Sequence, residues 1–190
     1  MAVTFTDAFV VAVLAAIILM YVRRHYGEVE YVRSSVDGRE YLVRKLPDSA
    51  RAADLLAELN ARLQRLVQHM AAKYPGDAAV RRLYDNYDPD ALSEGGTEAG
   101  YTSYSVNKGE KIVLCLRQRD DSFVDANVLM YVAVHELGHL MSASVGHNEE
   151  FWGSFRRVLE EAVAIGEYTK VDFASDPHSY CGISITSSVI

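Results

Sequence analysis

The chain has 190 residues, of which 49% are apolar and 24% are charged, and its formal net charge is −7. This composition is typical of a globular domain and excludes an intrinsically disordered chain. The charge is uneven, because residues 83–190 hold 7 Lys and Arg against 17 Asp and Glu, a charge of −10. Such a surface repels phosphate backbones, so direct binding of nucleic acid is not expected.

Residues 8–22 (AFVVAVLAAIILMYV) are 15 apolar residues without a charge, and Arg23, Arg24 and His25 follow them. We interpret residues 1–25 as a single-pass membrane anchor, because about 20 residues in a helix span a bilayer. A cleaved signal peptide is the alternative, but it would carry its basic residues before the apolar run. The positive-inside rule then predicts that residues 26–190 form a cytosolic domain.

Two stretches rich in Tyr and Val, residues 28–33 and 40–44, flank the turn signal Asp37-Gly38 and predict a hairpin. A long amphipathic helix is expected from Asp48 or Ser49 to about Lys73. A short helix is expected at 77–84, and the acidic, Gly-containing residues 85–100 predict a loop.

A second hairpin is predicted from residues 101–106 and 111–117, with a turn at 107–110. Two helices follow, from about 124 to 143 and from about 148 to 165, and the tail at 172–190 ends in β-forming residues. The order of elements indicates an α+β domain with a small, mainly antiparallel sheet. Cys115 and Cys181 are too few for a disulfide framework; they are compatible with a reducing compartment and also with one bridge.

Residues 135–139 (HELGH) form an HExxH motif. Positions i and i+4 lie about 40° apart around a helix, so His135 and His139 can both reach one zinc ion. Glu136 is placed to take a proton from a water molecule as a general base. Residues 128–134 are nearly all apolar, which indicates a buried helix, and burying two His and a Glu without partners would be costly. The motif therefore predicts a zinc site.

A catalytic zinc usually has three protein ligands and one open position. His147 is the third candidate, but eight residues of straight helix would place it about 12 Å from His139, too far to share a metal. The helix must therefore end between them, and Gly146 is the residue expected to end it in the left-handed conformation. Glu149 and Glu150 fit the first turn of the next helix better than they fit a ligand role.

Residues 135–152 (HELGHLMSASVGHNEEFW) resemble the WLM/SprT-like zinc metallopeptidases. Those enzymes combine HExxH with a downstream His, an Asx or Ser next to it, and Phe or Phe-Trp soon after. The resemblance covers about residues 100–165 and implies a zincin-like fold. It also implies that His135, His139 and His147 bind zinc and that Glu136 is the general base. The HExxHxxGxxH pattern of metzincins is not met.

Several other residues remain open as site residues. Glu160 and Glu161 lie 21 and 22 residues after His139, a separation compatible with a gluzincin-type third ligand. Cys181 and His178 are weaker candidates for an inhibitory tail over the zinc. Four tyrosines are candidates to stabilise an oxyanion, and the sequence does not choose among them: Tyr101, Tyr104, Tyr168 and Tyr180.

The function predicted from these observations is zinc-dependent hydrolysis of peptide bonds in protein or peptide substrates. An edge strand within residues 101–117 would align the substrate by backbone hydrogen bonds. One alternative is another zinc amide hydrolase such as a deformylase, with Cys115 as a ligand 20 residues before His135. A second is a membrane-tethered zinc-containing binding module without catalysis, in which four protein ligands would close the metal site. WLM/SprT-like relatives include enzymes that clear proteins crosslinked to DNA, but the acidic C-terminal half argues against that role here.

Overall fold

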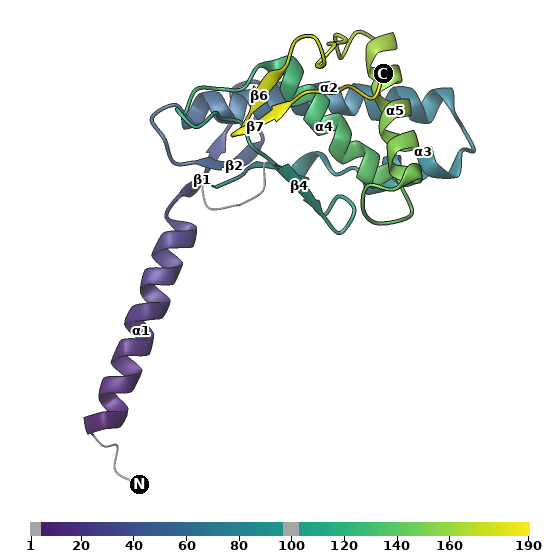
Figure 1. The fold of residues 1–190 in the computed structure, drawn as a ribbon. Helices are drawn as coiled ribbons and strands as arrows, with labels where there is room; N and C mark the ends of the chain where they lie inside the picture. The colour runs from purple at the N-terminus through teal and green to yellow at the C-terminus, as the bar shows by residue number, and fades with distance from the viewer. Residues whose placement is uncertain (1–4, 97–102) are drawn as a thin grey trace.

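The structure, a computed structural model, describes residues 5–96 and 103–190. Helix α1 (Phe5–Tyr26) projects from a body in which helices pack against a mixed sheet (Figure 1). In chain order, the further helices and strands of the described residues are β1 (Val29–Arg33), β2 (Glu40–Arg44), α2 (Ser49–Lys73), α3 (Ala78–Asn86), the 3-10 turn η1 (Pro89–Ala91), β3 (Leu92–Glu94), β4 (Ser103–Val106), β5 (Lys111–Leu114), α4 (Ala126–Met141), α5 (Glu149–Ala164), β6 (His178–Tyr180) and β7 (Ile183–Ile185).

Both predicted hairpins are present, and together they form most of one sheet with the strand order β1-β2-β3-β5-β4. The pairs β1–β2 and β4–β5 are antiparallel, and the turn between β1 and β2 contains Gly38 with a φ of 75°. Strand β3 lies between the hairpins and runs parallel to both β2 and β5. The α+β class is therefore confirmed, and the sheet is mixed: among the described residues its antiparallel residue pairs, nine in all, outnumber its four parallel pairs.

All four parallel pairs involve β3, which lies within residues 85–100, where we expected a loop; that expectation is wrong for this strand. This strand is only Leu92, Ser93 and Glu94, and all three residues are buried. Three residues are too few to show a period in the sequence, and two of the three are polar. Their strand conformation depends on partners distant in the sequence, since Ser93 pairs with Leu42 on one side and Val113 on the other.

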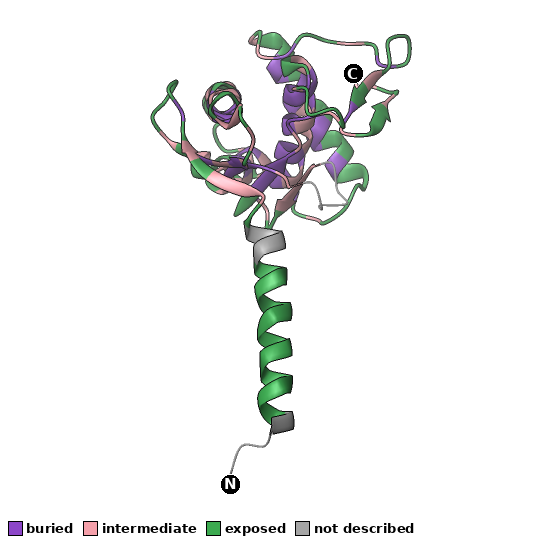
Figure 2. Cartoon of the chain, turned by 90° about the vertical axis from the view of Figure 1, so that its left-hand side faces the viewer, coloured by how far each residue is buried: buried purple, intermediate pink, exposed green. Residues whose placement is uncertain are grey.

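The helices of the body place their apolar residues in one core (Figure 2). Helix α2 buries the stripe expected from its sequence, including Leu56, Leu63 and Leu66. Helix α4 packs mainly against α5, and it also contacts α2, α3, β4 and β5. The HExxH helix is therefore enclosed by the sheet and by three helices, as its apolar sequence indicated.

The predicted membrane anchor is wrong. In the residues that the structure describes, no helix has both the length and the apolar character that a membrane span requires. The uncharged apolar run of α1 covers residues 8–22 only, and 15 residues at about 1.5 Å each are about 22 Å, shorter than a hydrocarbon core of about 30 Å. Two further predictions depended on this anchor and fall with it. They are the contact of residues 8–22 with a membrane and the cytosolic orientation derived from Arg23 and Arg24.

The C-terminal tail folds back onto the body as a second, two-stranded sheet made of β6 and β7. Cys181, in the turn of this hairpin, forms a disulfide with Cys115, which follows β5. The sequence was compatible with two free cysteines or with one disulfide, and the structure has the disulfide. The last residues, Val189 and Ile190, pack against the core, so the tail is part of the body.

Candidate metal centre and active-site cleft

Helix α4 carries both histidines of the HExxH motif. It begins after Asp125, whose side chain accepts hydrogen bonds from the backbone N–H groups of Asn127 and Val128 and so caps the first turn. It ends at Met141, because Ser142 adopts an extended conformation with a ψ of 140°. The expectation that Gly146 ends the helix is wrong; Gly146, with a φ of 86°, turns the following loop just before His147.

The carbonyl groups at the end of α4 are satisfied by side chains from other elements. Lys108, in the turn between β4 and β5, donates from Nζ to the carbonyl of Ser142 at 2.7 Å. Arg82 of α3 donates from Nε to the carbonyl of Met141 at 3.1 Å. These two donors replace hydrogen bonds that a longer helix would make, and both are cations at the negative end of the helix dipole. They allow the helix to end before His147.

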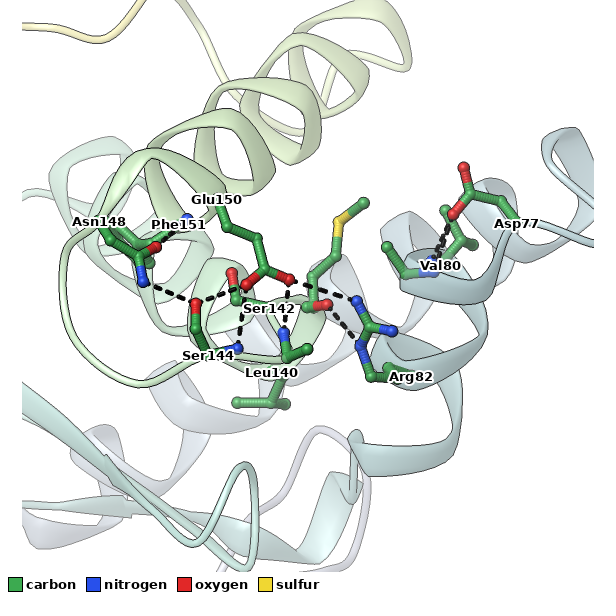
Figure 3. A network of polar contacts seen from close by, with 12 residues as sticks. Asp77, Val80, Arg82, Leu140, Ser142, Ser144, Asn148, Glu150 and Phe151 are labelled. Carbon is green, nitrogen blue, oxygen red and sulfur yellow. Dashed lines mark hydrogen bonds and ion pairs between the residues drawn. The ribbon is translucent and has the colours of Figure 1, made fainter.

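Glu150 fixes the loop between His139 and His147 (Figure 3). Its carboxylate accepts hydrogen bonds from the backbone N–H of Ala143 at 2.7 Å and of Ser144 at 3.0 Å. The Ser144 hydroxyl also donates to it, and Arg82 lies 3.5 Å from it on the other side. The hydrogen bonds from Ser144 and Ala143 lower the pKa of Glu150 to about 2. Glu150 therefore stays ionised and holds the loop in place, and it does not belong to the histidine cluster.

The loop brings His147 to the two histidines of α4. The Nε2 atom of His147 lies 3.0 Å from Nε2 of His135 and 3.2 Å from Nε2 of His139. Among the described residues, these three form the group whose ligand atoms, all within 4.8 Å of one another, could hold a metal ion. Tetrahedral ligands at 2.0–2.1 Å from a zinc ion would be about 3.3 Å apart, so these two separations suit nitrogen atoms that share one metal ion.

The charge state of the histidines also fits a metal ion. Burial, together with the neighbouring histidines, lowers the pKa of His135 to about 3 and that of His139 to about 4. Both imidazoles are therefore neutral at pH 7, which is the form that binds metals. The fully buried ring of Phe151 contacts all three imidazoles, with centroid distances of 4.8 Å to His135, 4.2 Å to His139 and 4.6 Å to His147. Phe151 thus supports the cluster from one side.

Glu136 is buried beside the cluster, with an exposed fraction of only 3%. Its Oε2 atom has no hydrogen-bond partner among the described protein atoms. Burial raises the pKa of Glu136 to about 7, and a hydrogen bond with Ser105 partly opposes that rise. The carboxyl group, His135, His139 and His147 all line a cleft of about 490 Å³. A buried carboxyl group with an unused oxygen in a cleft is suited to proton transfer.

The other candidate residues have different surroundings. Glu161 is joined to Lys73 at 2.8 Å and to His69 at 2.8 Å, and the Tyr74 hydroxyl also donates to it. It therefore connects α5 to the end of α2 and is not part of the histidine cluster, and Glu160 is exposed. Because Cys115 and Cys181 are bonded to each other, neither thiol is free to bind a metal.

The four tyrosines that were candidates to stabilise an oxyanion also differ in their positions. Tyr104 lines the cleft, whereas Tyr168 is buried in the core, where it packs against Tyr131. Tyr180 is buried, and its hydroxyl hydrogen-bonds with the hydroxyl of Ser103. Tyr101 lies outside the described residues. Only Tyr104 of the described three is a lining residue of the cleft.

Sequence reasoning missed three supporting residues: Lys108, Arg82 and Ser105. Lys108 and Arg82 satisfy the end of α4, and Ser105 contacts Glu136. No sequence signal identifies them, because each belongs to an element that meets α4 only in the folded chain. Glu150 was correctly expected in the first turn of a helix, but its bonds to the preceding loop were not anticipated.

The WLM domain family model matches residues 91–188. "Uncharacterized protein R325" of Acanthamoeba polyphaga mimivirus is 28% identical over 182 residues, which cover 93% of this chain and 92% of that protein. "Uncharacterized protein 136R" of Invertebrate iridescent virus 6 is 25% identical over 173 residues, covering 85% and 91%. The crystal structure of Wss1 from Saccharomyces cerevisiae is similar in fold, with a TM-score of 0.52 and 20% identity, over 66% of this chain and 88% of that one. Because the family match spans more than half of the chain and contains the whole histidine cluster, the chain belongs to the WLM domain family.

Proposed function

We propose that the protein is a zinc-dependent metallopeptidase that hydrolyses peptide bonds in protein or peptide substrates. The observation that carries the proposal is the meeting of three Nε2 atoms and one buried carboxyl group in a single cleft. Membership of the WLM domain family supports the same function.

In this proposal, His135, His139 and His147 hold the zinc ion. Three imidazole ligands leave one position of a tetrahedral ion open, which is the arrangement of catalytic rather than structural zinc sites. A zinc ion held there would supply Lewis acidity, polarising the substrate carbonyl and lowering the pKa of a water molecule.

Glu136 is the proposed general base. With a pKa of about 7, a substantial fraction of its carboxyl groups is ionised at neutral pH and can accept a proton. The free Oε2 atom takes the proton from the attacking water as the new C–O bond forms. The protonated Glu136 then gives this proton to the departing amine nitrogen as the C–N bond breaks, so the residue returns to its starting form.

Strand β4 is the proposed docking edge for the substrate. It is the terminal strand in the order β1-β2-β3-β5-β4 of the described residues. Ser103, Tyr104 and Ser105 of this strand line the cleft beside Glu136. An extended peptide can add to such an edge through main-chain hydrogen bonds, which places a peptide bond next to the reacting groups.

The test is to compare the full-length protein with Glu136→Gln for zinc content and for cleavage of casein or a peptide library. We expect zinc to stay bound and the cleavage rate to fall by at least about a hundredfold, the usual scale for losing a general base. The exposed Glu160→Gln on α5 is the control and should keep full activity. Equal turnover by Glu136→Gln and wild type would contradict the proposed role of Glu136.

The ligands are tested separately by metal analysis. His135→Ala, His139→Ala and His147→Ala should each lose most of the zinc. If His147→Ala keeps its zinc while Glu161→Gln loses it, the proposed ligand set is wrong. A wild-type protein that binds zinc tightly but cleaves no substrate would indicate a zinc-containing binding module instead.

A further inference from the structure

The C-terminal hairpin β6–β7 is attached to the segment that follows β5. Gln118 donates from Nε2 to the carbonyl of Ser179 at 2.8 Å, and its Oε1 accepts a hydrogen bond from the backbone N–H of Cys181 at 3.1 Å. The Cys115–Cys181 disulfide adds a covalent bond between the same two segments, which are 66 residues apart in the sequence. The hairpin has only three residue pairs, and so short a ribbon is not stable alone in water. Its position therefore depends on contacts with the body, which include these attachments and the packing of Tyr180 in the core.

Tyr180, next to the bridge, extends from the hairpin to the active-site strand β4. Its side chain is almost completely buried, with 1% exposed, and its hydroxyl oxygen lies 2.5 Å from Oγ of Ser103. Ser103 Oγ also accepts a hydrogen bond from the backbone N–H of Cys115 at 3.2 Å. Ser103 is thus held between the residue that precedes Cys181 and the backbone of Cys115.

Ser103 and Glu136 are connected through the same strand. Residues two apart in a strand point to the same face, so Ser103 and Ser105 face the same side of β4. Ser105 hydrogen-bonds with Glu136, and both serines line the cleft. Burial, with a contribution from the negative charge of Glu136, raises the pKa of Tyr180 to about 12, so its phenol is neutral at pH 7. The contacts run from Tyr180 through β4 to the proposed base.

The turn of the hairpin gives independent evidence that Cys181 serves to attach it. Cys181 and Gly182 are the two residues of the turn, with φ values of 50° and 89°. Two-residue turns with both φ values positive favour Asn or Asp followed by Gly, because other side chains are disfavoured in the left-handed region. A Cys at this position is a poor turn residue, and the covalent bond to Cys115 gives it a different purpose.

We propose that Tyr180 is a positioning residue for the substrate-binding strand β4, and that the Cys115–Cys181 disulfide holds it there. Reduction of the bridge would then release the hairpin, free Ser103 and loosen the edge of the cleft. The consequence for substrate binding rests on the proposed peptidase function, whereas the loosening of β4 does not.

The redox step is a two-electron reduction. The S–S bond breaks and two S–H bonds form, while a dithiol donor supplies two electrons and two protons and becomes a disulfide itself. In the experiment a water-soluble phosphine replaces the dithiol, because dithiols bind zinc. The phosphine takes the oxygen atom of one water molecule to become a phosphine oxide, and the two protons of that water go to the two thiolates.

The first arm of the test is hydrogen exchange on the full-length, zinc-loaded protein before and after phosphine treatment. We expect amides of residues 178–185 and 103–106 to exchange at least about tenfold faster after reduction, because local opening becomes easier. Amides of α2 should not change. The double variant Cys115→Ser/Cys181→Ser should match the reduced protein and should not respond to phosphine. Unchanged exchange in 103–106 upon reduction would overturn the proposal, whether or not the protein is a peptidase.

The second arm removes only the hydroxyl of Tyr180. Tyr180→Phe should raise exchange in 103–106 and raise KM for peptide substrates about two- to tenfold, the scale of one lost hydrogen bond, with zinc content and kcat nearly unchanged. Tyr84→Phe on α3, where the side chain is exposed, is the control. Reduction should add little to the KM of Tyr180→Phe, since both changes remove the same contact.

A purely structural role would lower the unfolding midpoint and leave KM and exchange in 103–106 unchanged, which would overturn the positioning role. If neither the wild type nor any variant cleaves a substrate, only the proposed peptidase function is contradicted. The hydrogen-exchange result still tests the positioning role of Tyr180.

Discussion

Helices α1 and α4 have similarly apolar sequences but opposite surroundings. Residues 8–22 of α1 and residues 128–134 of α4 are both nearly free of polar side chains. Every residue from 7 to 22 is exposed, whereas α4 is buried over most of its length (Figure 2). An apolar sequence therefore does not tell whether a helix is buried in its own domain; that depends on which other elements pack against it.

The polar residues of the two helices sharpen the contrast. In α4, His135, Glu136 and His139 come after the apolar stretch and meet at one cleft. Their burial has a cost unless they are paired, and the neighbouring His147 and Ser105 provide part of the compensation. In α1 the basic residues 23 and 24 only follow the apolar run. The apolar stretch of α4 therefore leads directly into a polar site inside the domain.

The largest expected effect is a matched leucine truncation in the two helices. Leu137 of α4 has no exposed surface, and Leu137→Ala should lower the free energy of unfolding by about 2–5 kcal/mol, because it leaves a cavity. Leu14 of α1 is 53% exposed, and Leu14→Ala should change it by less than about 0.5 kcal/mol. Urea denaturation followed by circular dichroism measures both. Equal effects in the two variants would break the comparison.

The next effect concerns the support of α5, the main partner of α4, and depends on pH. Burial alone would raise the pKa of Glu161, but the hydrogen bonds from Lys73, Tyr74 and His69 outweigh it and lower the pKa to about 2. A carboxyl group with a lowered pKa in the folded state stabilises that state above its unfolded pKa, and this stabilisation is lost as the pH falls toward the folded value.

Wild-type stability should therefore decrease between about pH 4.5 and pH 2 through this group, and Glu161→Gln should show a smaller decrease over the same interval. The measurement is the free energy of unfolding at a series of pH values. Glu160→Gln, at the exposed neighbouring position, should keep the wild-type profile. An identical pH profile for Glu161→Gln and wild type would show that the cluster around Glu161 does not stabilise the fold.

A smaller effect is expected where α4 ends and the loop to His147 begins. Glu150→Ala removes the acceptor for the N–H groups of Ala143 and Ser144, so the loop should sample more conformations. Zinc affinity should fall about tenfold, the low end of the effect of residues that orient metal ligands. Competition with a chelating dye measures it. Glu149→Ala is the matched neighbour and should bind zinc as the wild type does; an equal loss in both would indicate a general effect of charge.

The smallest effect is expected from removing α1. Because residues 7–22 are exposed, a chain that begins at residue 27 should have a free energy of unfolding within about 0.5 kcal/mol of the full chain. Zinc content should also be unchanged, since the three histidines lie in α4 and in the loop before α5. Thermal unfolding and metal analysis test this. A large loss of stability would mean that α1 supports the body despite its exposure.

Sequence by itself determined the elements whose signals are local. The turn at Asp37-Gly38, the first turn of α5 at Glu149 and Glu150, and the apolar stripe of α2 all rest on residues a few positions apart. The HExxH spacing belongs to the same class, because a helix brings positions i and i+4 to one face by its own geometry. The turn and the helices formed as predicted because each of them contains the interactions that specify it.

Only the tertiary structure decided what depends on distant partners. Strand β3 exists because β2 and β5 flank it, and the Cys115–Cys181 pair requires the tail to return to the sheet. His147 meets His135 and His139 because Lys108 and Arg82 satisfy the end of α4 while Glu150 holds the loop. The exposure of α1 also depends on the other elements, because its apolar side chains are buried only if another element packs against them. Such contacts join residues far apart in the chain, so they cannot be predicted from a local sequence pattern.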